Sequence, residues 1–466
     1  MSIDNQGIKS KLESGLVTIF VTDNHPLIKL ANNIDWERLY QIILPDLKAS
    51  SLKGFWWLGR KLKVRIHLAA YILQQLYNKT DRQTEYSIKD NGAYQVFCGL
   101  NIVDKFHCPD HTKIEEFRSR LSPSTQNKLA NEITVLAVHL GYADASCMDI
   151  DSTTQEANMA YPSDVNLLVK LAKIADKVWH EIQDKISYFQ PYDFKLDLKK
   201  IKSLARSCFF DKKKENKSDN LFNLWVATHT EVHKILKLNI SLIEEGIKKF
   251  SWSAKRALVQ LQKHARIYLK DVMHYVINGS MKKGKALSFH LNEVSCFTKN
   301  AVGDVLKFGR RFQLGRLKGN FLIIKDSSNV REEDKETLSD VVNLHENLFG
   351  ISKLHSVATD KGYYSKENKD LLVAKKIEEI GLQQPRHTGS LPSDIREELK
   401  TKLVNRRAGI EPLIGHCKHG GQLGKSRMKS DKTTLSAAYS SVFSFNLRQI
   451  TRNLMGKTGS VASVES

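Results

Sequence analysis

Residues 149–164 read DIDSTTQEANMAYPSD, in which two aspartates lie two positions apart beside apolar residues. From about residue 145 the sequence alternates with a period of two, which indicates a strand, and strand side chains alternate between the two faces of a sheet. Asp149 and Asp151 are therefore expected on the same face. Like charges side by side repel each other, so this arrangement calls for a positive group nearby.

The charge of the chain indicates a polyanionic partner. Its 466 residues include 72 Lys and Arg against 51 Asp and Glu, a formal net charge of +21. An excess of this size favours nucleic acid first and an anionic membrane surface second. The alternative is a solvated basic surface without a partner.

Cysteine spacing and hydropathy predict a cytoplasmic protein. The six cysteines are scattered, which is typical of thiols in a reducing compartment. The His–Cys clusters at 107–111 and 416–419 lack a second half at zinc-finger spacing. The N-terminus lacks a signal-peptide pattern, and no apolar run is long enough to span a membrane.

The pattern along the chain predicts an α/β core interrupted by helices. A strand near residue 145 and a hairpin over 301–326, with its turn near Lys318 and Gly319, belong to this core. The predicted segments are a flexible lead-in (1–24), an N-terminal helical domain (25–140), the core (141–164 and 291–455), a helical insertion (165–290) and a disordered tail (456–466). We interpret the N-terminal domain as DNA-binding, with a plain helical bundle as the alternative. For the insertion, DNA binding, dimerisation and packing alone stay open.

Three acids that are distant in sequence occupy comparable positions. Asp151 ends or interrupts an apolar strand, Asp360 follows the strand HSVAT, and Glu411 lies in RRAGIEPLIGHCK. Singly, each would be an ordinary cap or turn residue. Carboxylates that converge at strand ends bind hard divalent cations, and two such ions promote phosphoryl transfer. A metal pair would also relieve the repulsion at Asp149 and Asp151.

These residues carry a resemblance to bacterial insertion-sequence DDE transposases. The run 151–168 resembles the first-aspartate block of that family at Asp151, Thr153, Glu156, Asn158, Tyr161, Pro162, Asp164, Leu167 and Leu168. The run 358–368 is similar to the second block at Asp360, Gly362, Tyr363 and Asn368. Arg407, Glu411 and Lys418 keep the spacing of the third block. Its tyrosine position is Val404, which puts that side chain's supporting contact in doubt but not the three acids.

The resemblance covers residues 25–455 and implies an RNase H-like mixed-sheet core. It implies that Asp151, Asp360 and Glu411 bind two Mg²⁺ ions, with Asp151 bridging both and Mn²⁺ as a substitute. Hydrolytic nicking of DNA would precede attack of the freed 3′-OH on target DNA. Asp149 then falls outside the triad, as a residue that flanks it.

Two basic residues accompany Glu411 in the third block. Arg407 lies four positions before Glu411 and Lys418 seven after it, so all three share about one face of a helix. We expect Arg407 and Lys418 to contact a DNA phosphate near the scissile bond. The alternative is that they are charge partners of Glu411 on a solvated helix.

The resemblance also implies the partners. These are double-stranded DNA, as the terminal inverted repeats of the element and as target DNA, and a second copy of the chain in a homodimeric synaptic complex, without a membrane. The protein would be cytoplasmic and associated with the nucleoid. A nuclease that cuts without joining and a non-catalytic DNA-binding regulator of the element are the alternatives; the complete set of three acids argues against the regulator.

Overall fold

The computed structural model describes residues 9–11, 16–18, 21–50, 61–100, 108–186, 196–210, 214–244, 252–282, 284–299, 305–327, 333–382 and 397–456. The chain divides into two compact units, residues 1–158 with 295–466 and residues 159–294. The predicted insertion, 165–290, lies within the second unit. The predicted tail lies outside the described residues apart from Gly456.

The first unit begins with a short strand pair in the predicted lead-in and continues as a series of helices. The elements are β1 (Lys9–Lys11), β2 (Leu16–Thr18), α1 (Pro26–Asn33), α2 (Trp36–Ser50), α3 (Lys61–Leu76), α4 (Asp81–Asp90), α5 (Gly92–Cys98), α6 (His111–Arg120) and α7 (Pro123–His139). Short polar side chains start several of these helices. The Asp35 carboxylate accepts a hydrogen bond from the Arg38 amide at 2.9 Å, and Asp110 caps α6 in the same way.

A mixed sheet forms the centre of the first unit and confirms the predicted α/β class. Its strands are β3 (Asp144–Glu156), β4 (Ser295–Lys299), β5 (Val305–Lys318), β6 (Phe321–Asp326), β7 (Ser356–Thr359) and β8 (Glu379–Gly381). The strand order is β4-β5-β3-β7-β8, and β6 pairs with the second half of β5. β5 runs antiparallel to β3, whereas β7 and β8 continue the sheet in parallel.

The β5–β6 hairpin confirms the predicted turn. Gly319 and Asn320 both have positive φ, at 97° and 65°. A Cβ atom on residue 319 would lie 2.2 Å from the carbonyl oxygen of Tyr142, so only glycine fits this backbone path.

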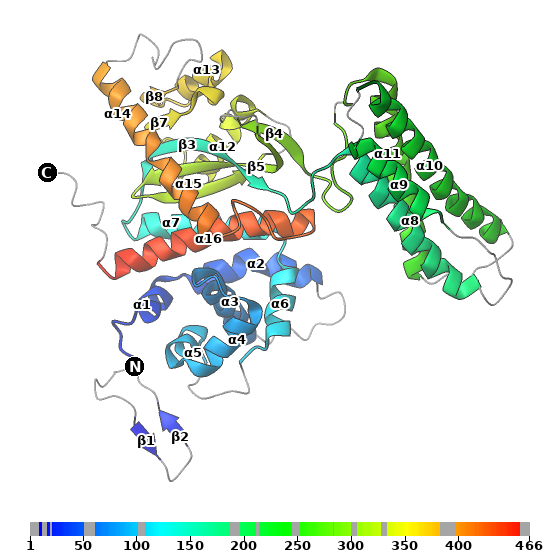
Figure 1. Cartoon of the computed structure of the whole chain (residues 1–466). Coiled ribbons are helices and arrows are strands. Elements are labelled where there is room, and N and C mark those ends of the chain that lie inside the picture. Colours follow the sequence, from blue (N-terminus) through cyan, green and yellow to red (C-terminus); the bar gives the residue numbers. More distant parts are fainter. Residues whose placement is uncertain are drawn as a thin grey trace. The chain divides into compact units, whose positions relative to one another are not determined.

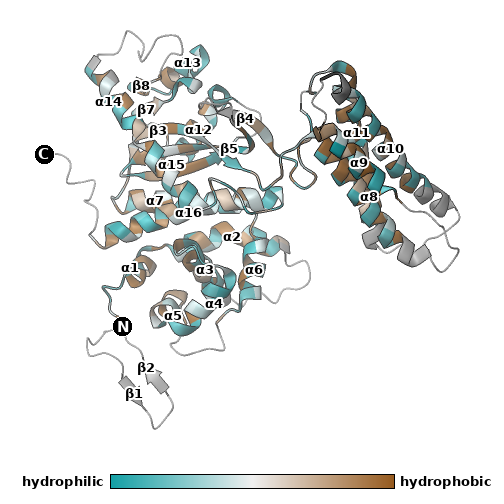
Figure 2. Cartoon of the chain, viewed as in Figure 1, coloured by the Kyte–Doolittle hydropathy of each residue, from teal (hydrophilic) through white to brown (hydrophobic). Residues whose placement is uncertain are grey.

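Helices cover both faces of the sheet (Figure 1). Met148 and Ile150 of β3 share one core with α12 (Asp334–Phe349). On the other face, apolar residues of β5 and β6 join a larger core that includes α7 and α16 (Asp431–Leu454) and reaches the N-terminal helices. The strands of the sheet carry both hydrophobic and hydrophilic residues in Figure 2.

The second unit is a helical bundle with its own core. It comprises α8 (Asp164–Ile186), α9 (Leu198–Phe210), α10 (Lys214–Glu244) and α11 (Trp252–Asn278). Leucines at helical spacing, such as Leu168 and Leu171 of α8, are fully buried against Leu224 and Leu261. Within the described parts of both units, no helix is long and apolar enough to cross a membrane.

His345 of α12 is fully buried beneath the sheet and predicts a pH-dependent stability. Its Nε2–H donates to the carbonyl oxygen of Ala145 at 2.8 Å, and burial lowers the pKa of the imidazole from 6.5 to about 4. Between pH 6.5 and 4, His345 is therefore protonated in the unfolded chain but stays neutral in the folded chain. The free energy of unfolding is unaffected by this group above pH 6.5 and decreases below it. We expect a loss of about 3 kcal/mol from this group by pH 4.

Urea denaturation from pH 7 to pH 4 measures this dependence. In His345→Gln the slope over this range should be reduced, because glutamine does not titrate. A variant with the same pH slope as the wild type would contradict the assignment to His345.

Candidate active site

The register of the central strands brings two of the three acids together. β3 and β7 run parallel with Ile150 opposite Thr359, so the next step along both strands places Asp151 beside Asp360. Asp360 directly follows β7 and caps the 3-10 helix η2 (Lys361–Tyr363). β3 continues to Glu156, and Asp151 therefore interrupts the apolar part of the strand and does not end it.

Glu411 reaches the same place from a helix that is interrupted. The predicted single helix is wrong in one detail, because it is divided at Gly409 into α14 (Glu397–Ala408) and α15 (Ile410–His419). Gly409 keeps nearly helical dihedral angles, and the four-residue spacing from Arg407 to Glu411 still brings their side chains within 3.4 Å.

Arg407 lies among all three carboxylates. Its Nη2 atom is 3.3 Å from Asp151 Oδ2, 3.4 Å from Glu411 Oε1 and 3.9 Å from Asp360 Oδ2. Three acids separated by up to 260 residues in sequence thus approach one nitrogen atom. The site opens from a buried end to solvent, since the side chains of Asp151, Asp360 and Glu411 are 15%, 48% and 62% exposed.

Burial and charge act in opposite directions on Asp151. Burial raises the pKa of its carboxyl group and the Asp360 carboxylate adds to the rise, whereas the Arg407 guanidinium and the amide of Ser152 oppose it. The Ser152 amide donates to Asp151 Oδ1 at 2.7 Å and so fixes the orientation of the carboxylate. A cation at this place favours the charged form of Asp151.

The arginine takes the central position between the acids. In the described ranges, no group of three or more His, Cys, Asp or Glu side chains is arranged to hold a metal ion directly.

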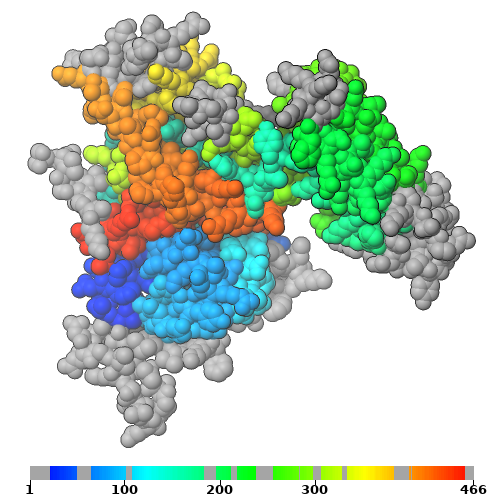
Figure 3. Space-filling model, viewed as in Figure 1, coloured from blue at the N-terminus to red at the C-terminus, as the bar shows by residue number. Residues whose placement is uncertain are grey.

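Lys418 lies two turns beyond Glu411 on α15, about 10 Å along the helix axis. The surfaces of α14 and α15 are in view in Figure 3, in orange.

Asp149 belongs to a neighbouring ion cluster that fixes α14 to the sheet. Its buried carboxylate accepts hydrogen bonds from Arg406 Nε at 2.7 Å and from Arg316 Nη1 at 3.2 Å. Arg406 also donates to Ser356 Oγ of β7, and Arg316 donates to the Arg406 carbonyl oxygen, both at 2.7 Å. Asp149 therefore lies beside the three acids and contacts the helix that carries Arg407.

The sequence interpretation missed Arg406 and Arg316. Arg406 and Arg407 pair with Asp149 and Asp151, and the adjacent pair of arginines was the available signal. Arg316 stands directly opposite Asp149 on β5. A Cβ atom at Gly409 would lie 2.3 Å from Arg316 Nη1, so a side chain there would require the flexible guanidinium of Arg316 to shift.

The other residues of the three blocks mostly support the surrounding backbone. Glu156 forms an ion pair with Lys307 of β5, and Asn158 Nδ2 donates to the carbonyl oxygen of Arg427 at 2.9 Å. Val404, at the tyrosine position of the third block, packs against the small core of Ala358 and Leu403. Tyr161 is 61% exposed.

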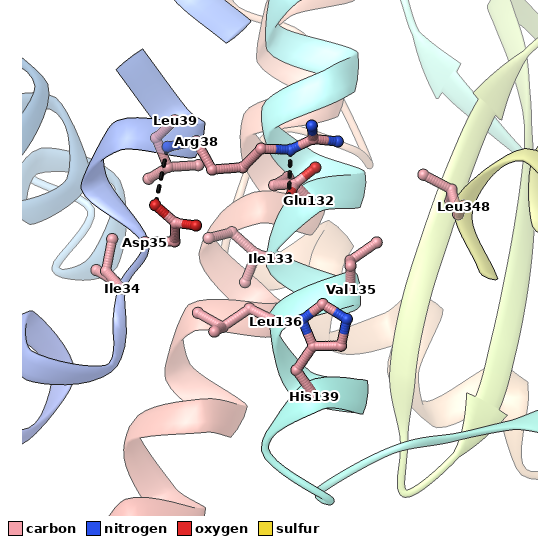
Figure 4. A pocket seen from close by; sticks show the side chains of 10 residues that line it. All are labelled: Ile34, Asp35, Arg38, Leu39, Glu132, Ile133, Val135, Leu136, His139 and Leu348. Carbon is pink, nitrogen blue, oxygen red and sulfur yellow. Dashed lines mark hydrogen bonds and ion pairs between the residues drawn. The ribbon is translucent and has the colours of Figure 1, made fainter. Parts of the chain in front are cut away.

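A separate pocket lies between α2, α7 and α12 (Figure 4). The Arg38 Nε atom lies 3.1 Å from Glu132 Oε1 at this pocket, and Leu136 and His139 line it from α7. None of the three converging acids lines it, so we do not assign the chemistry to this pocket.

Comparison with known proteins identifies the N-terminal part of the chain. Residues 17–120 match the family model described as Transposase domain (DUF772). No curated protein and no solved structure matches the chain. The matched stretch contains β2 and α1 to α6 and precedes the sheet that carries the acids. The match over residues 17–120 supports a transposase, in agreement with the resemblance to transposases in the sequence.

Proposed function

We propose that the chain is a DDE transposase that cleaves DNA at the ends of its element and transfers the 3′-OH ends to target DNA. The observation that carries this proposal is the approach of Asp151, Asp360 and Glu411 to a single nitrogen atom of Arg407. A transposase domain in the same chain supports DNA as the substrate. The sheet, with antiparallel strands on one side of β3 and parallel strands on the other, is compatible with the RNase H-like core that the resemblance implies.

The donor types of the three acids suit Mg²⁺, although Arg407 lies among them in this arrangement. Asp151, Asp360 and Glu411 offer only carboxylate oxygens, which are the ligands that Mg²⁺ and Mn²⁺ prefer, and the Arg407 guanidinium already places a positive charge among them. When bound, a pair of such ions activates the attacking oxygen and stabilises the leaving oxygen. These three residues would hold the ions.

The chain's own residues supply positioning and charge. Asp151 is held by β3 and by the Ser152 amide, so its carboxylate has one orientation. Asp360 and Glu411 lie on the open side, where a DNA strand can approach. Phosphoryl transfer of this kind needs no covalent nucleophile from the protein. Arg407 and Lys418 are proposed to contact DNA phosphates near the scissile bond.

Charge in the helical unit supports a DNA partner as well. α9 and α11 together contain nine Lys and Arg and one acid, whereas α8 and α10 contain eight Lys and eight acids. At 100° per residue, the five cations of α11 lie within an arc of about 100°. These exposed residues are Lys255, Arg256, Lys263, Arg266 and Lys270. The one acid of α11, Asp271, is buried and paired with Lys282 at 2.8 Å.

We therefore predict that the cationic face of α11 binds the DNA backbone. Changing Lys255, Lys263, Arg266 and Lys270 together to Gln should weaken binding to duplex DNA and lower the salt slope of log K by up to about 4, since each phosphate contact contributes about 0.9. Fluorescence anisotropy over a range of salt concentrations measures both effects.

A matched control removes four lysines from the balanced helices. These are Lys173 and Lys177 of α8 and Lys234 and Lys237 of α10, all exposed. Because both variants lose four positive charges, equal losses of affinity would mean that only net charge matters and that α11 has no special role.

A strand-transfer assay tests the proposed function. The substrate is a labelled duplex that carries the ends of the element, with a supercoiled plasmid as target and Mg²⁺ or EDTA present. We expect cleaved ends and plasmid joined to the label, both only with Mg²⁺. Cleavage without joining would indicate a nuclease, and binding without cleavage would indicate a regulator of the element; either result would contradict the proposal.

A further inference from the structure

We propose that Arg407 is the internal counter-ion of the acidic site and that it competes with divalent cations for the same carboxylates. Cation binding would then release the guanidinium. The inference rests on the proposed function, because it assigns a divalent cation to Asp151, Asp360 and Glu411. It adds that binding of the cation would free Arg407 to bind the DNA substrate.

The contacts of Arg407 differ from those of its neighbour in a way that suits release. Arg406 is anchored through two nitrogens, Nε to Asp149 at 2.7 Å and Nη1 to Ser356 Oγ at 2.7 Å. Arg407 makes all three of its ion pairs through Nη2, at 3.3–3.9 Å. Its Nε is buried and has no hydrogen-bond partner in the described part of the chain. The partners of Arg407 are therefore mainly the carboxylates that a cation would take.

Charge explains why the two cations exclude each other. One guanidinium among three carboxylates leaves a formal charge of −2, so the site still attracts a divalent cation. A divalent ion on the same oxygens would repel the guanidinium at short range in a partly buried site, where Coulomb interactions are strong. The effect is reciprocal: if Arg407 weakens cation binding by some factor, cation binding weakens the interaction of Arg407 with the carboxylates by the same factor.

The released side chain would suit the substrate. A guanidinium binds phosphate through two parallel hydrogen bonds, and Arg407 lies beside the open end of the site, where Asp360 and Glu411 are exposed. Arg407 would thus neutralise the acids before metal binds and contact a DNA phosphate afterwards.

Binding of Mg²⁺ to the full chain without DNA tests the competition. By isothermal titration calorimetry, Arg407→Gln should bind MgCl₂ at least about fivefold more tightly than the wild type, the lower end of ordinary coupling between sites. Without divalent cations it should unfold at a lower temperature, because three carboxylates lose their counter-ion, and Mg²⁺ should reduce that difference. Arg427→Gln removes an exposed arginine outside the acid cluster and should match the wild type in both measurements.

Equal or weaker Mg²⁺ binding by Arg407→Gln would overturn the inference. If that variant does not fold, Arg407→Lys provides the test, because a shorter ammonium group neutralises the carboxylates less well and Mg²⁺ should again bind more tightly than in the wild type; unchanged or weaker binding would refute the competition. Asp151→Asn separates the two proposals. If it binds Mg²⁺ as tightly as the wild type, the metal assignment in the proposed function fails, whatever the Arg407 variants do.

Discussion

Replacing Asp151 by Asn is expected to lower Mg²⁺-dependent cleavage of element-end DNA by about 10³-fold or more, with DNA binding retained. The substitution keeps the size of the side chain and its place on β3 but removes the buried negative charge that faces Asp360 and Arg407. A neutral amide is a poor ligand for Mg²⁺. Single-turnover cleavage of labelled duplex measures the loss, and anisotropy measures binding.

Asp144→Asn is the matched control for this prediction. Asp144 lies on the same strand, is 37% exposed, forms a long ion pair of 3.9 Å with Lys318 and accepts local hydrogen bonds from the amide and hydroxyl of Ser146, both at 2.8 Å. The same loss of charge there should leave cleavage near the wild-type rate. Unchanged cleavage by Asp151→Asn would remove Asp151 from the active site.

Asp149→Ala is expected to destabilise the fold by about 3–5 kcal/mol, the range for removing one partner of a buried ion pair. The Asp149 side chain is 4% exposed, and its loss leaves Arg406 and Arg316, each 18% exposed, without their shared counter-ion. The contact of α14 with β3 and β7 depends on these bonds. Equilibrium unfolding in urea at pH 7 measures the change.

Two comparisons define the cause of that loss. Asp149→Asn keeps an oxygen acceptor for Arg406 and should cost less than alanine. Asp144→Ala removes a partly exposed carboxylate from the same strand, with its local hydrogen bonds to Ser146, and should cost less than Asp149→Ala. If Asp149→Ala were no more destabilising than Asp144→Ala, the cluster would not hold α14 in place.

The sequence predicted the features that depend on local spacing. Alternation placed Asp149 and Asp151 on one face, and each indeed pairs with an arginine of α14. The hairpin followed from Gly319 in an alternating segment. The convergence of Asp151 with Asp360 depends on a parallel register between strands about 200 residues apart. Local spacing cannot predict such a register, and only the resemblance to a family indicated that the two acids belong together.

Features that depend on long-range packing were missed or misjudged. The polar run after Asp151 gave no clear strand end, yet β3 continues because Thr153 and Thr154 pair with β5 and Gln155 donates to the Gln422 carbonyl oxygen at 2.8 Å. The role of Arg406 depends on how α14 docks on the sheet, which its own sequence does not specify. The division of the helix at Gly409 was not predicted either, and the Arg316 guanidinium, from a distant strand, lies close to this glycine.

The most direct test of the central claim is whether the three acids act as one unit in DNA cleavage. Mg²⁺-dependent cleavage rates would be measured for Asp151→Asn, Asp360→Asn, Glu411→Gln and the triple variant on one element-end duplex. Residues that act as a unit are strongly non-additive, so we predict that each single variant loses about as much activity as the triple variant. Single losses that are small and multiply to the loss in the triple variant would contradict a shared site.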